Sequence, residues 1–331
     1  MKYNKKLIRG AFAIIIVGLV IVGLMLLDVK PQKRKQIIFV SKKVDESDFW
    51  SSLVAGAQMA AEEYNVDLKV VAPDQEENYI EQNELIHNAI KQKPDAIALA
   101  PSDYQKSATA AQEIVKQGIQ LILIDSVVKG AKPDAIVATD NVKAGMTMGK
   151  WISRECKDVC QIGIVSHVKG SSTAIEREKG LRKGLGKQEP NIVKTVYSDS
   201  NYSKAYNVTK TLLLENPQIN MIAGLNEYST VGAARAIKDM GLSRTVHIIG
   251  FDNSLEEIEL LEAGVVDGLV IQKSFDMGYL GIQTAVKLLD EGQVESNNID
   301  SGSKLICKEN IYTDENQKLL FPFKTKNKNA K

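Results

Sequence analysis

Four short apolar runs of the sequence each end in a pair of polar side chains that could bind a small polar ligand. Carboxylates accept hydrogen bonds, and amides both donate and accept them. Each residue could instead cap the helix that follows, because Asp, Asn and Ser side chains bind the free amides of a first helical turn. Position alone does not decide between the two roles. The pairs are Asp125 and Ser126, Asp140 and Asn141, Asn226 and Glu227, and Asp252 and Asn253.

Two aromatic residues, Phe49 and Trp50, stand side by side in the stretch SKKVDESDFWSSLVAGAQ, residues 41–58. They fall between an acidic run and the start of a predicted helix. The pair could line a binding site, or it could be a hydrophobic staple at the helix start.

The sequence carries none of the common catalytic motifs. It has no G-x-x-x-x-G-K-[ST] phosphate loop, no G-x-G-x-x-G fingerprint and no H-E-x-x-H zinc motif. His87 lies in a polar helix, His247 inside an apolar strand, and His167 in a loop after a strand, where it could face a cleft. We therefore predict a binding protein and not an enzyme, with no cofactor and no metal.

The balance of charges argues against nucleic acid as a partner. Lys plus Arg number 42 and Asp plus Glu number 41, so the formal net charge is +1. A protein that follows phosphate backbones needs a strongly basic surface. No nucleic-acid partner is expected.

Apolar β-branched runs alternate with amphipathic helices from Gln36 onward. Continuous apolar strands separated by helices indicate parallel sheets covered on both faces. Because 331 residues exceed the usual size of one domain, two doubly wound α/β lobes are expected. Ligands of such folds bind at the carboxyl ends of the strands. Helices are predicted over about 49–64, 79–91, 106–117, 142–155, 173–185, 204–214 and 230–239.

The N-terminal run GAFAIIIVGLVIVGLMLL, residues 10–27, is uncharged and has about the length at which a helix spans a membrane. It lacks the A-x-A-like exit of a cleaved signal, and no cysteine follows it as in a lipoprotein. We predict a cytoplasmic tail, an uncleaved transmembrane signal anchor and a linker in residues 1–35, with the globular part outside the cell. A cleaved signal peptide is the alternative. Charge alone does not settle the orientation, because basic residues flank both ends of the run.

Three cysteines, Cys156, Cys160 and Cys307, are too few for a disulfide framework. A C-x-x-x-C pair without histidine partners is also a poor zinc pattern. A local bridge between Cys156 and Cys160 is one alternative, and free thiols are the predicted state.

Residues 36–310 resemble the type 1 periplasmic sugar-binding proteins, in particular the ribose- and xylose-binding branch. The matching segments follow the family's order through most of the globular part. The resemblance implies two similar lobes joined by a three-strand hinge, with a sugar held between them. The segments are SDFWSSLVAGAQMAAEEY, PDAIALAPSD, LILIDS, ATDNVKAG, SSTAIEREKGLRKGL, NEYSTVGAARAIKDMG, HIIGFDN and VIQKSFDMGYLG.

The resemblance also implies which residues hold the sugar. By motif, the family's ring-stacking aromatics, hydroxyl-binding aspartates, arginine, asparagine and hinge glutamine fall on Phe49, Trp50, Asp125, Asp252, Arg177, Asn226 and Gln272. Ser126 and Asp140 complete the predicted site. Many relatives have arginine where this chain has Ser126, so a bidentate donor is missing. Tyr202 is a candidate for the family's second-lobe aromatic.

The family's crossovers, placed on this chain, divide it into two lobes. The first lobe is predicted at residues 36–140 plus 273–302, and the second at 141–272 plus 303–314. Residues 315–331 are predicted to be a flexible tail.

A two-lobed binder that closes on its ligand converts occupancy into a shape that a partner can detect. Because an anchor suits a fixed sensory complex, we predict a membrane-anchored monosaccharide-binding protein that signals to a membrane sensor histidine kinase. A pentose such as xylose or ribose is the expected ligand. An ABC permease fed by this protein is the alternative partner. The core of a sugar-responsive repressor is a second alternative, although the chain lacks the basic helix-turn-helix that such repressors carry.

Overall fold

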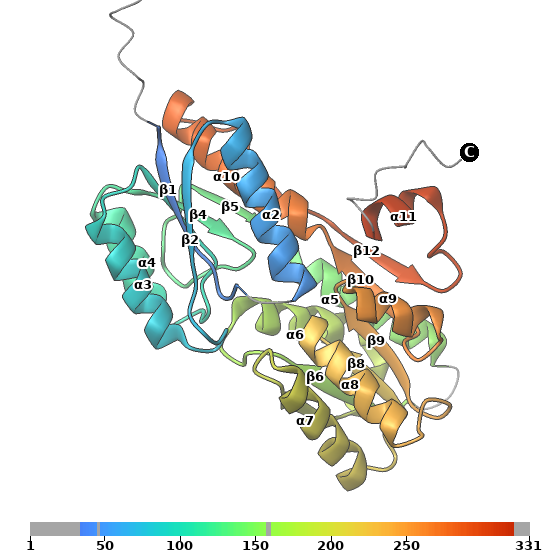
Figure 1. Ribbon diagram of the computed structural model, residues 1–331. Coiled ribbons are helices and arrows are strands. Elements are labelled where there is room, and N and C mark those ends of the chain that lie inside the picture. Colours follow the sequence, from blue (N-terminus) through green and yellow to red (C-terminus); the bar gives the residue numbers. More distant parts are fainter. Residues whose placement is uncertain (1–33, 45–46, 157–159, 321–331) are drawn as a thin grey trace, which may run out of the picture. The chain divides into compact units, whose positions relative to one another are not determined.

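The computed structural model describes residues 34–44, 47–156 and 160–320. From Gln36 onward the chain forms two lobes, each a six-stranded sheet with helices on both faces (Figure 1). The prediction of two parallel-sheet α/β lobes is confirmed. The predicted transmembrane segment lies outside the described residues. Among the residues that are described, no helix has both the length and the apolar character needed to cross a membrane.

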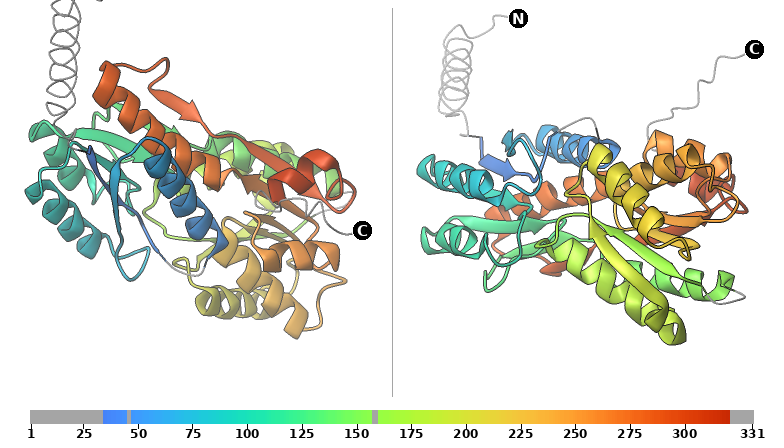
Figure 2. Two further views of the ribbon diagram at one scale, coloured as in Figure 1. Left: turned by 45° about the horizontal axis from the view of Figure 1, so that its top comes forward. Right: turned by 90° about the horizontal axis from the view of Figure 1, so that it is seen from below.

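The first lobe is built on a fully parallel sheet with strand order β11-β5-β4-β3-β1-β2. Helices α2 (Asp48–Glu63) and α10 (Ser274–Glu291) pack on one face, and α3 (Tyr79–Lys91) and α4 (Ala108–Lys116) pack on the other (Figure 2). Apolar side chains on both faces of the strands explain why these runs are continuous in sequence. The strands are β1 (Gln36–Val40), β2 (Asp67–Val71), β3 (Ala96–Leu99), β4 (Gln120–Ile124), β5 (Ala135–Ala138) and β11 (Asn298–Asp300).

The second lobe repeats this plan with strand order β12-β10-β9-β8-β6-β7, except that β12 runs antiparallel to β10. Helices cover both faces of the sheet. The first face carries α5 (Asn141–Glu155) and α6 (Ser172–Leu185), and the second carries α7 (Tyr202–Glu215), α8 (Glu227–Asp239) and α9 (Leu255–Glu262). The strands are β6 (Ile162–Ser166), β7 (Ile192–Tyr197), β8 (Met221–Gly224), β9 (His247–Phe251), β10 (Gly268–Gln272) and β12 (Ser303–Cys307), and a 3-10 helix, η1 (Gly186–Asn191), precedes β7.

The chain crosses between the two sheets after β5, after β10 and after β11. The first and third crossovers touch, because Thr139 Oγ1 lies 3.3 Å from Ser301 Oγ and Asp140 N donates to Asp300 Oδ1 (3.1 Å). Adjoining short segments of this kind can absorb the change in backbone angles when two lobes close.

Helices α5 and α6 cross with their backbones in contact. A Cβ atom at Gly145 would lie 2.2 Å from Arg177 O, and one at Gly180 would lie 2.1 Å from Val142 O. Only glycine fits at so close an approach. The crossing therefore fixes the turn of α6 that carries Arg177.

Helix α11 (Asp314–Leu320) begins one residue before the predicted flexible tail, residues 315–331, and includes the first six residues of that tail. Leu320 is buried in the second-lobe core together with Ile306 and Ile311. Residues 315–320 thus differ from the prediction, because the apolar end of this helix packs on the core. Residues 321–331 lie outside the described part of the chain.

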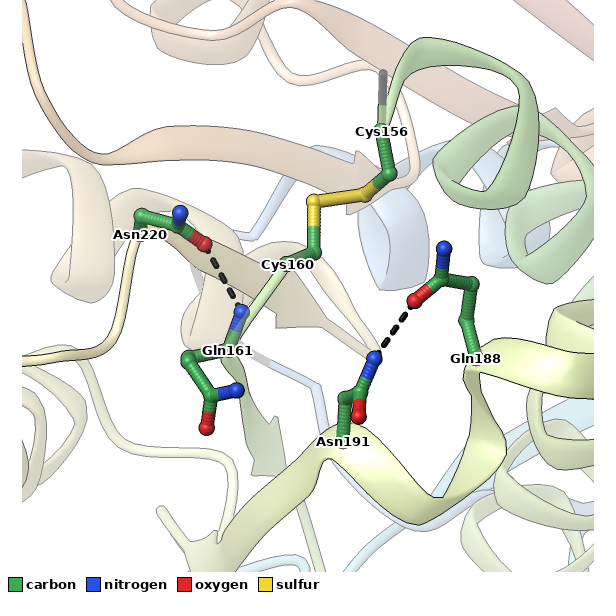
Figure 3. Close-up of a disulfide and its surroundings, with 6 residues drawn as sticks. All are labelled: Cys156, Cys160, Gln161, Gln188, Asn191 and Asn220. Carbon is green, nitrogen blue, oxygen red and sulfur yellow. Dashed lines mark hydrogen bonds between the residues drawn. A yellow bond between two sulfur atoms is a disulfide. The ribbon is translucent and has the colours of Figure 1, made fainter. Parts of the chain in front are cut away.

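Cys156 and Cys160 form a disulfide with a Cα–Cα distance of 5.7 Å (Figure 3). The prediction of free thiols at these positions is wrong. Because α5 ends at Glu155 and β6 begins at Ile162, the two cysteines flank one short connection between a helix and a strand. Cys307 is free and buried.

Removal of this disulfide should lower the free energy of unfolding by about 2 kcal/mol, the loop-entropy value for a bridge across a few residues. Urea unfolding of the Cys156→Ser, Cys160→Ser double variant against the wild type measures the effect. Reductant should destabilise the wild type by a similar amount and leave the double variant unchanged. Superimposable unfolding curves for all samples would contradict a stabilising bridge.

Candidate functional site

A small polar cavity lies where the two lobes meet. Its free volume is about 20 Å³, close to the space of one water-sized sphere. A sugar ring is larger than this, so we expect a sugar to enter when the lobes separate and the lining side chains to move aside when the lobes close on it. The cavity is lined by Lys42, Phe49, Trp50, Glu76, Asp125, His167, Thr173, Arg177, Asn226, Glu227, Tyr228, Asp252 and Gln272.

The structure brings most of the predicted site residues together at this cavity and leaves two outside it. Phe49, Trp50, Asp125, Arg177, Asn226, Asp252 and Gln272 line the cavity. Ser126 and Asp140 instead line a neighbouring hollow of about 300 Å³, which shares Asp125 as a wall. Ser126 Oγ donates to Pro101 O (3.1 Å), and Asp140 caps α5 by accepting from Lys143 N (2.9 Å). Helix capping, the alternative role left open by the sequence, therefore applies to Asp140.

The aromatic pair belongs both to the cavity and to the first-lobe core. The rings of Phe49 and Trp50 meet edge to face, with centroids 5.1 Å apart. Trp50 is buried and Phe49 is half-buried, and both pack against the core cluster on α2 and α10. Phe49 and Trp50 therefore pack in the first-lobe core and also form part of the cavity wall.

Lys42 is a buried lysine in the first-lobe wall of the cavity, and it was not among the predicted site residues. Lys42 is 1% exposed, and its Nζ donates to Asp125 Oδ2 (2.8 Å). Glu76 Oε1 lies 4.0 Å from the same nitrogen, and the Trp50 ring centroid lies 5.9 Å away. Within the described residues, Asp125 is the one acceptor in hydrogen-bond range of this ammonium group. Because an ammonium group carries three N–H donors, two remain for a ligand.

Lys42 supplies a positive charge beside Asp125, where many relatives have an arginine and this chain has Ser126. Ser126 supplies no charge, but Lys42 places a cation beside the Asp125 carboxylate from the end of β1. Burial raises the pKa of the neighbouring Glu76 carboxyl, and the charge of Lys42 opposes that rise. Its position could have been predicted from the sequence, because Lys42 follows the end of a strand just as Asp125 does.

Arg177 is the main donor of the second-lobe side. Its Nε donates to Asn141 Oδ1 (2.8 Å) and its Nη1 donates to Leu225 O (2.8 Å), while the guanidinium lies 4.4 Å from the Phe251 ring centroid. These contacts hold the planar group in one orientation. Arg177 is 3% exposed, so the fork is fixed and largely desolvated before a ligand arrives.

Asp252 and Gln272 form a hydrogen-bonded pair at the hinge side of the cavity. Gln272 Nε2 donates to Asp252 Oδ1 (2.6 Å), and Glu227 N donates to Asp252 Oδ2 (2.9 Å). Burial raises the pKa of Asp252, and the charge of Arg177 opposes the rise. Asp252 and Asp125 both adopt the left-handed backbone region, with φ of 81° and 66°. Such conformations in non-glycine residues concentrate at functional sites.

Asn226 acts as the N-cap of α8, which is one of the two roles that the sequence left open for it. Its side chain accepts from Ser229 N (2.9 Å) at the start of α8 and donates to Ser200 Oγ (3.1 Å). Asn226 still lines the cavity, so any contact with a ligand would use its remaining capacity.

Two buried polar atoms at the cavity, His167 Nδ1 and Gln272 Oε1, have no hydrogen-bond partner within the part of the chain that the structure describes. His167 Nε2 lies 2.9 Å from Thr173 Oγ1. Burial and the charges of Arg177 and Lys42 hold the pKa of His167 well below its usual value, so the imidazole is neutral. A buried polar group without a partner costs about 1–3 kcal/mol. A small ligand whose hydroxyls both donate and accept would satisfy these atoms and the free donors of Lys42.

Known proteins with a similar sequence or structure are binding proteins for small molecules. A family model described as a periplasmic binding protein domain matches residues 37–293. The chain belongs to the periplasmic binding protein family. The predicted resemblance to its sugar-binding type 1 branch is confirmed by relatives that include ribose and allose binders.

Relatives of this family member are similar over most of their length. The ribose import binding protein RbsB of Bacillus subtilis is 24% identical over 263 residues, which are 80% of this chain and 85% of that protein. The crystal structure of a sugar transporter from Clostridium phytofermentans is 46% identical, with a TM-score of 0.79, and covers 83% of this chain and 100% of its own. An ABC transporter solute-binding protein from Agrobacterium vitis with bound D-fucose is 31% identical, with a TM-score of 0.82, and covers 85% of this chain and 98% of its own.

These proteins are named for binding or transport and not for catalysis. The prediction that the chain is not an enzyme agrees with them.

Proposed function

We propose that this protein binds one monosaccharide between its two lobes outside the cytoplasm, with a pentose such as ribose or xylose as the expected ligand. The observation that carries the proposal is the set of buried, unsatisfied polar groups at the cavity beside the aromatic pair. Among residues 34–44, 47–156 and 160–320, Lys42 keeps two free donors, and His167 Nδ1 and Gln272 Oε1 have no partner. A relative named for ribose and a structure that holds D-fucose support a sugar of this size.

The chemistry of each group sets its role in the proposed site. Phe49 and Trp50 cover a face of the ring, since aromatic surfaces pack against C–H bonds. Asp125 and Asp252 accept from hydroxyls, and Arg177 and Lys42 donate to them. Asn226 and Gln272 complete the rim. Ser126 and Asp140 support the site from the neighbouring hollow by fastening the loop after β4 and the start of α5.

The membrane anchor and the signalling partner extend this proposal. Residues 10–27 carry no charge and have the length of a membrane span. The Cys156–Cys160 disulfide fits an oxidising compartment outside the cytoplasm. A binder held in the membrane plane suits a sensor histidine kinase that detects lobe closure. Delivery to a sugar ABC permease is the second candidate, because the relative with bound D-fucose is named as part of an ABC transporter.

Calorimetric titration of the full-length protein in detergent tests the binding proposal. The panel is D-ribose, D-xylose, D-arabinose, D-fucose and D-allose. We expect one or more of these sugars to bind without turnover, and to stabilise the fold by about 2.7 kcal/mol at 100 times the dissociation constant. If no sugar of the panel binds, the proposed ligand class is wrong.

Purification of the tagged protein from its native membrane, with and without the sugar, tests the partner. A histidine kinase retained with the protein would support signalling. A permease retained in its place would favour the transport alternative.

A further inference from the structure

The first turn of α2, which carries the aromatic pair, is capped by a residue of the opposite lobe. Glu227 stands at the start of α8 and accepts from Asp48 N through Oε1 (3.3 Å) and from Phe49 N through Oε2 (3.1 Å). Within the first lobe, Ser47 Oγ accepts from Trp50 N (3.4 Å) in this turn. The first amides of a helix have no partner inside the helix. The second lobe therefore supplies the acceptor that these two amides require.

The capping is reciprocal. Asp48 Oδ2 accepts from Leu255 N (2.8 Å), the first amide of α9 in the second lobe. Tyr202 OH also donates to Glu227 Oε1, which holds the carboxylate in place from α7. Negative groups are favoured at helix N-termini. Each lobe thus offers a carboxylate to a helix of the other, and both contacts exist only while the lobes are together.

We infer that Glu227 is a positioning residue that fastens α2 to the second lobe and so sets the placement of Phe49 and Trp50 against the ligand. This inference rests on the proposed sugar-binding function. Glu227 holds the backbone of Phe49 itself and of the residue before it. Separation of the lobes breaks both hydrogen bonds, so placement of the aromatic wall and lobe closure occur together.

The surroundings of Glu227 make this contact sensitive to protons. Burial raises the pKa of Glu227 to about 7, hydrogen bonds from Tyr202 and Phe49 oppose the rise, and the charges of Asp252 and Asp48 add to it. Glu257 of α9, fully buried, is a further acid that interacts with it. Two cations lie over aromatic rings of the neighbouring helices, Arg235 over Tyr202 (5.4 Å) and Lys43 over Tyr228 (5.1 Å).

The direction of the pH effect follows from linkage. When the lobes separate, Glu227 faces water and its pKa returns toward the ordinary value of 4.5. Closure then takes up a proton between these two pKa values, so the closed form is favoured as pH falls from 8 toward 6. The shift predicts sugar binding about tenfold tighter at pH 6 than at pH 8.

Sugar affinity of the full-length protein between pH 6 and pH 8 tests the inference, with the tightest-binding sugar of the panel as probe. The wild type should show the tenfold change. Glu227→Gln, which resembles the protonated acid, should give a flat profile. Glu227→Ala should also be flat and bind about tenfold more weakly than the wild type at pH 6. Glu259→Gln removes an exposed acid of α9 on the same lobe, so it should behave as the wild type.

A measurement without ligand separates this inference from the proposed function. Spin labels on the exposed residues Asn88 of α3 and Lys210 of α7 report the distance between the lobes. The short-distance population should grow from pH 8 to pH 6 in the wild type and not in Glu227→Gln. Equal distance distributions and equal pH profiles in both proteins would overturn the positioning role, even if sugar binds. If the label result holds but no sugar binds, the proposed function fails and the contact between the lobes stands.

Discussion

Replacing Asp252 with asparagine should weaken sugar binding about 100-fold while the protein stays folded. Asp252 accepts from Gln272 Nε2 and Glu227 N, and its carboxylate faces the cavity. Asparagine keeps the shape and tolerates the left-handed backbone at φ 81°. It loses the charge and one acceptor oxygen. Hydrogen bonds to a charged group are worth about 1.5–3 kcal/mol each, and a loss of about 2.7 kcal/mol corresponds to 100-fold in the dissociation constant.

Calorimetry with the tightest-binding sugar of the panel measures this loss, and urea unfolding checks the fold. Asp267→Asn is the matched control, because this carboxylate precedes β10, at the end of the strand away from the cavity, and pairs with His247. The control should bind as the wild type does. Equal affinities for Asp252→Asn and the wild type would remove Asp252 from the site.

Replacing Lys42 with methionine should lower the free energy of unfolding by about 3–5 kcal/mol, because it leaves a buried carboxylate without its partner. Lys42 and Asp125 are 1% and 3% exposed, and they lie 2.8 Å apart. The variant should also lose sugar affinity, since two donors disappear from the cavity. The double variant Lys42→Met, Asp125→Leu should recover much of the stability but not the binding, because the Asp125 carboxylate is removed together with its partner.

Urea unfolding of the two single variants, the double variant and the wild type forms a complete mutant cycle. Lys43→Met is the neighbouring control. Lys43 is half-buried over the Tyr228 ring, a contact worth about 0.5–1 kcal/mol. If Lys42→Met unfolds at the same urea concentration as the wild type, Lys42 and Asp125 do not act as a buried ion pair.

The sequence predicted those helices and strands that show a regular spacing of apolar residues. The prediction of a helix over 79–91 coincides with α3, and the helix over 142–155 differs from α5 by one residue. The alternation of apolar runs and amphipathic segments predicted no helix over the residues of α9 or α10. Helix α10 follows a second-lobe strand yet packs on the first lobe against α2, which is a tertiary arrangement that periodicity does not report.

Part of the candidate site could be predicted from the sequence, because parallel strands bring their carboxyl ends together at one edge of the sheet. This rule located Asp125 and Asp252, and it could have located Lys42. A lysine is normally exposed, so its burial depends on Asp125, which lies 83 residues away in sequence. The state of Cys156 and Cys160 likewise depends on the course of the chain between α5 and β6, and spacing alone does not give it.

The central claim is that a monosaccharide binds between the lobes, with Asp125 on one side and Asp252 on the other. A crystal structure of the protein grown with its tightest-binding sugar tests this claim most directly. We expect the ring against Phe49 and Trp50, with its hydroxyls on Asp125, Asp252 and Arg177. A sugar bound outside this cavity, for example in the hollow lined by Ser126 and Asp140, would contradict the claim.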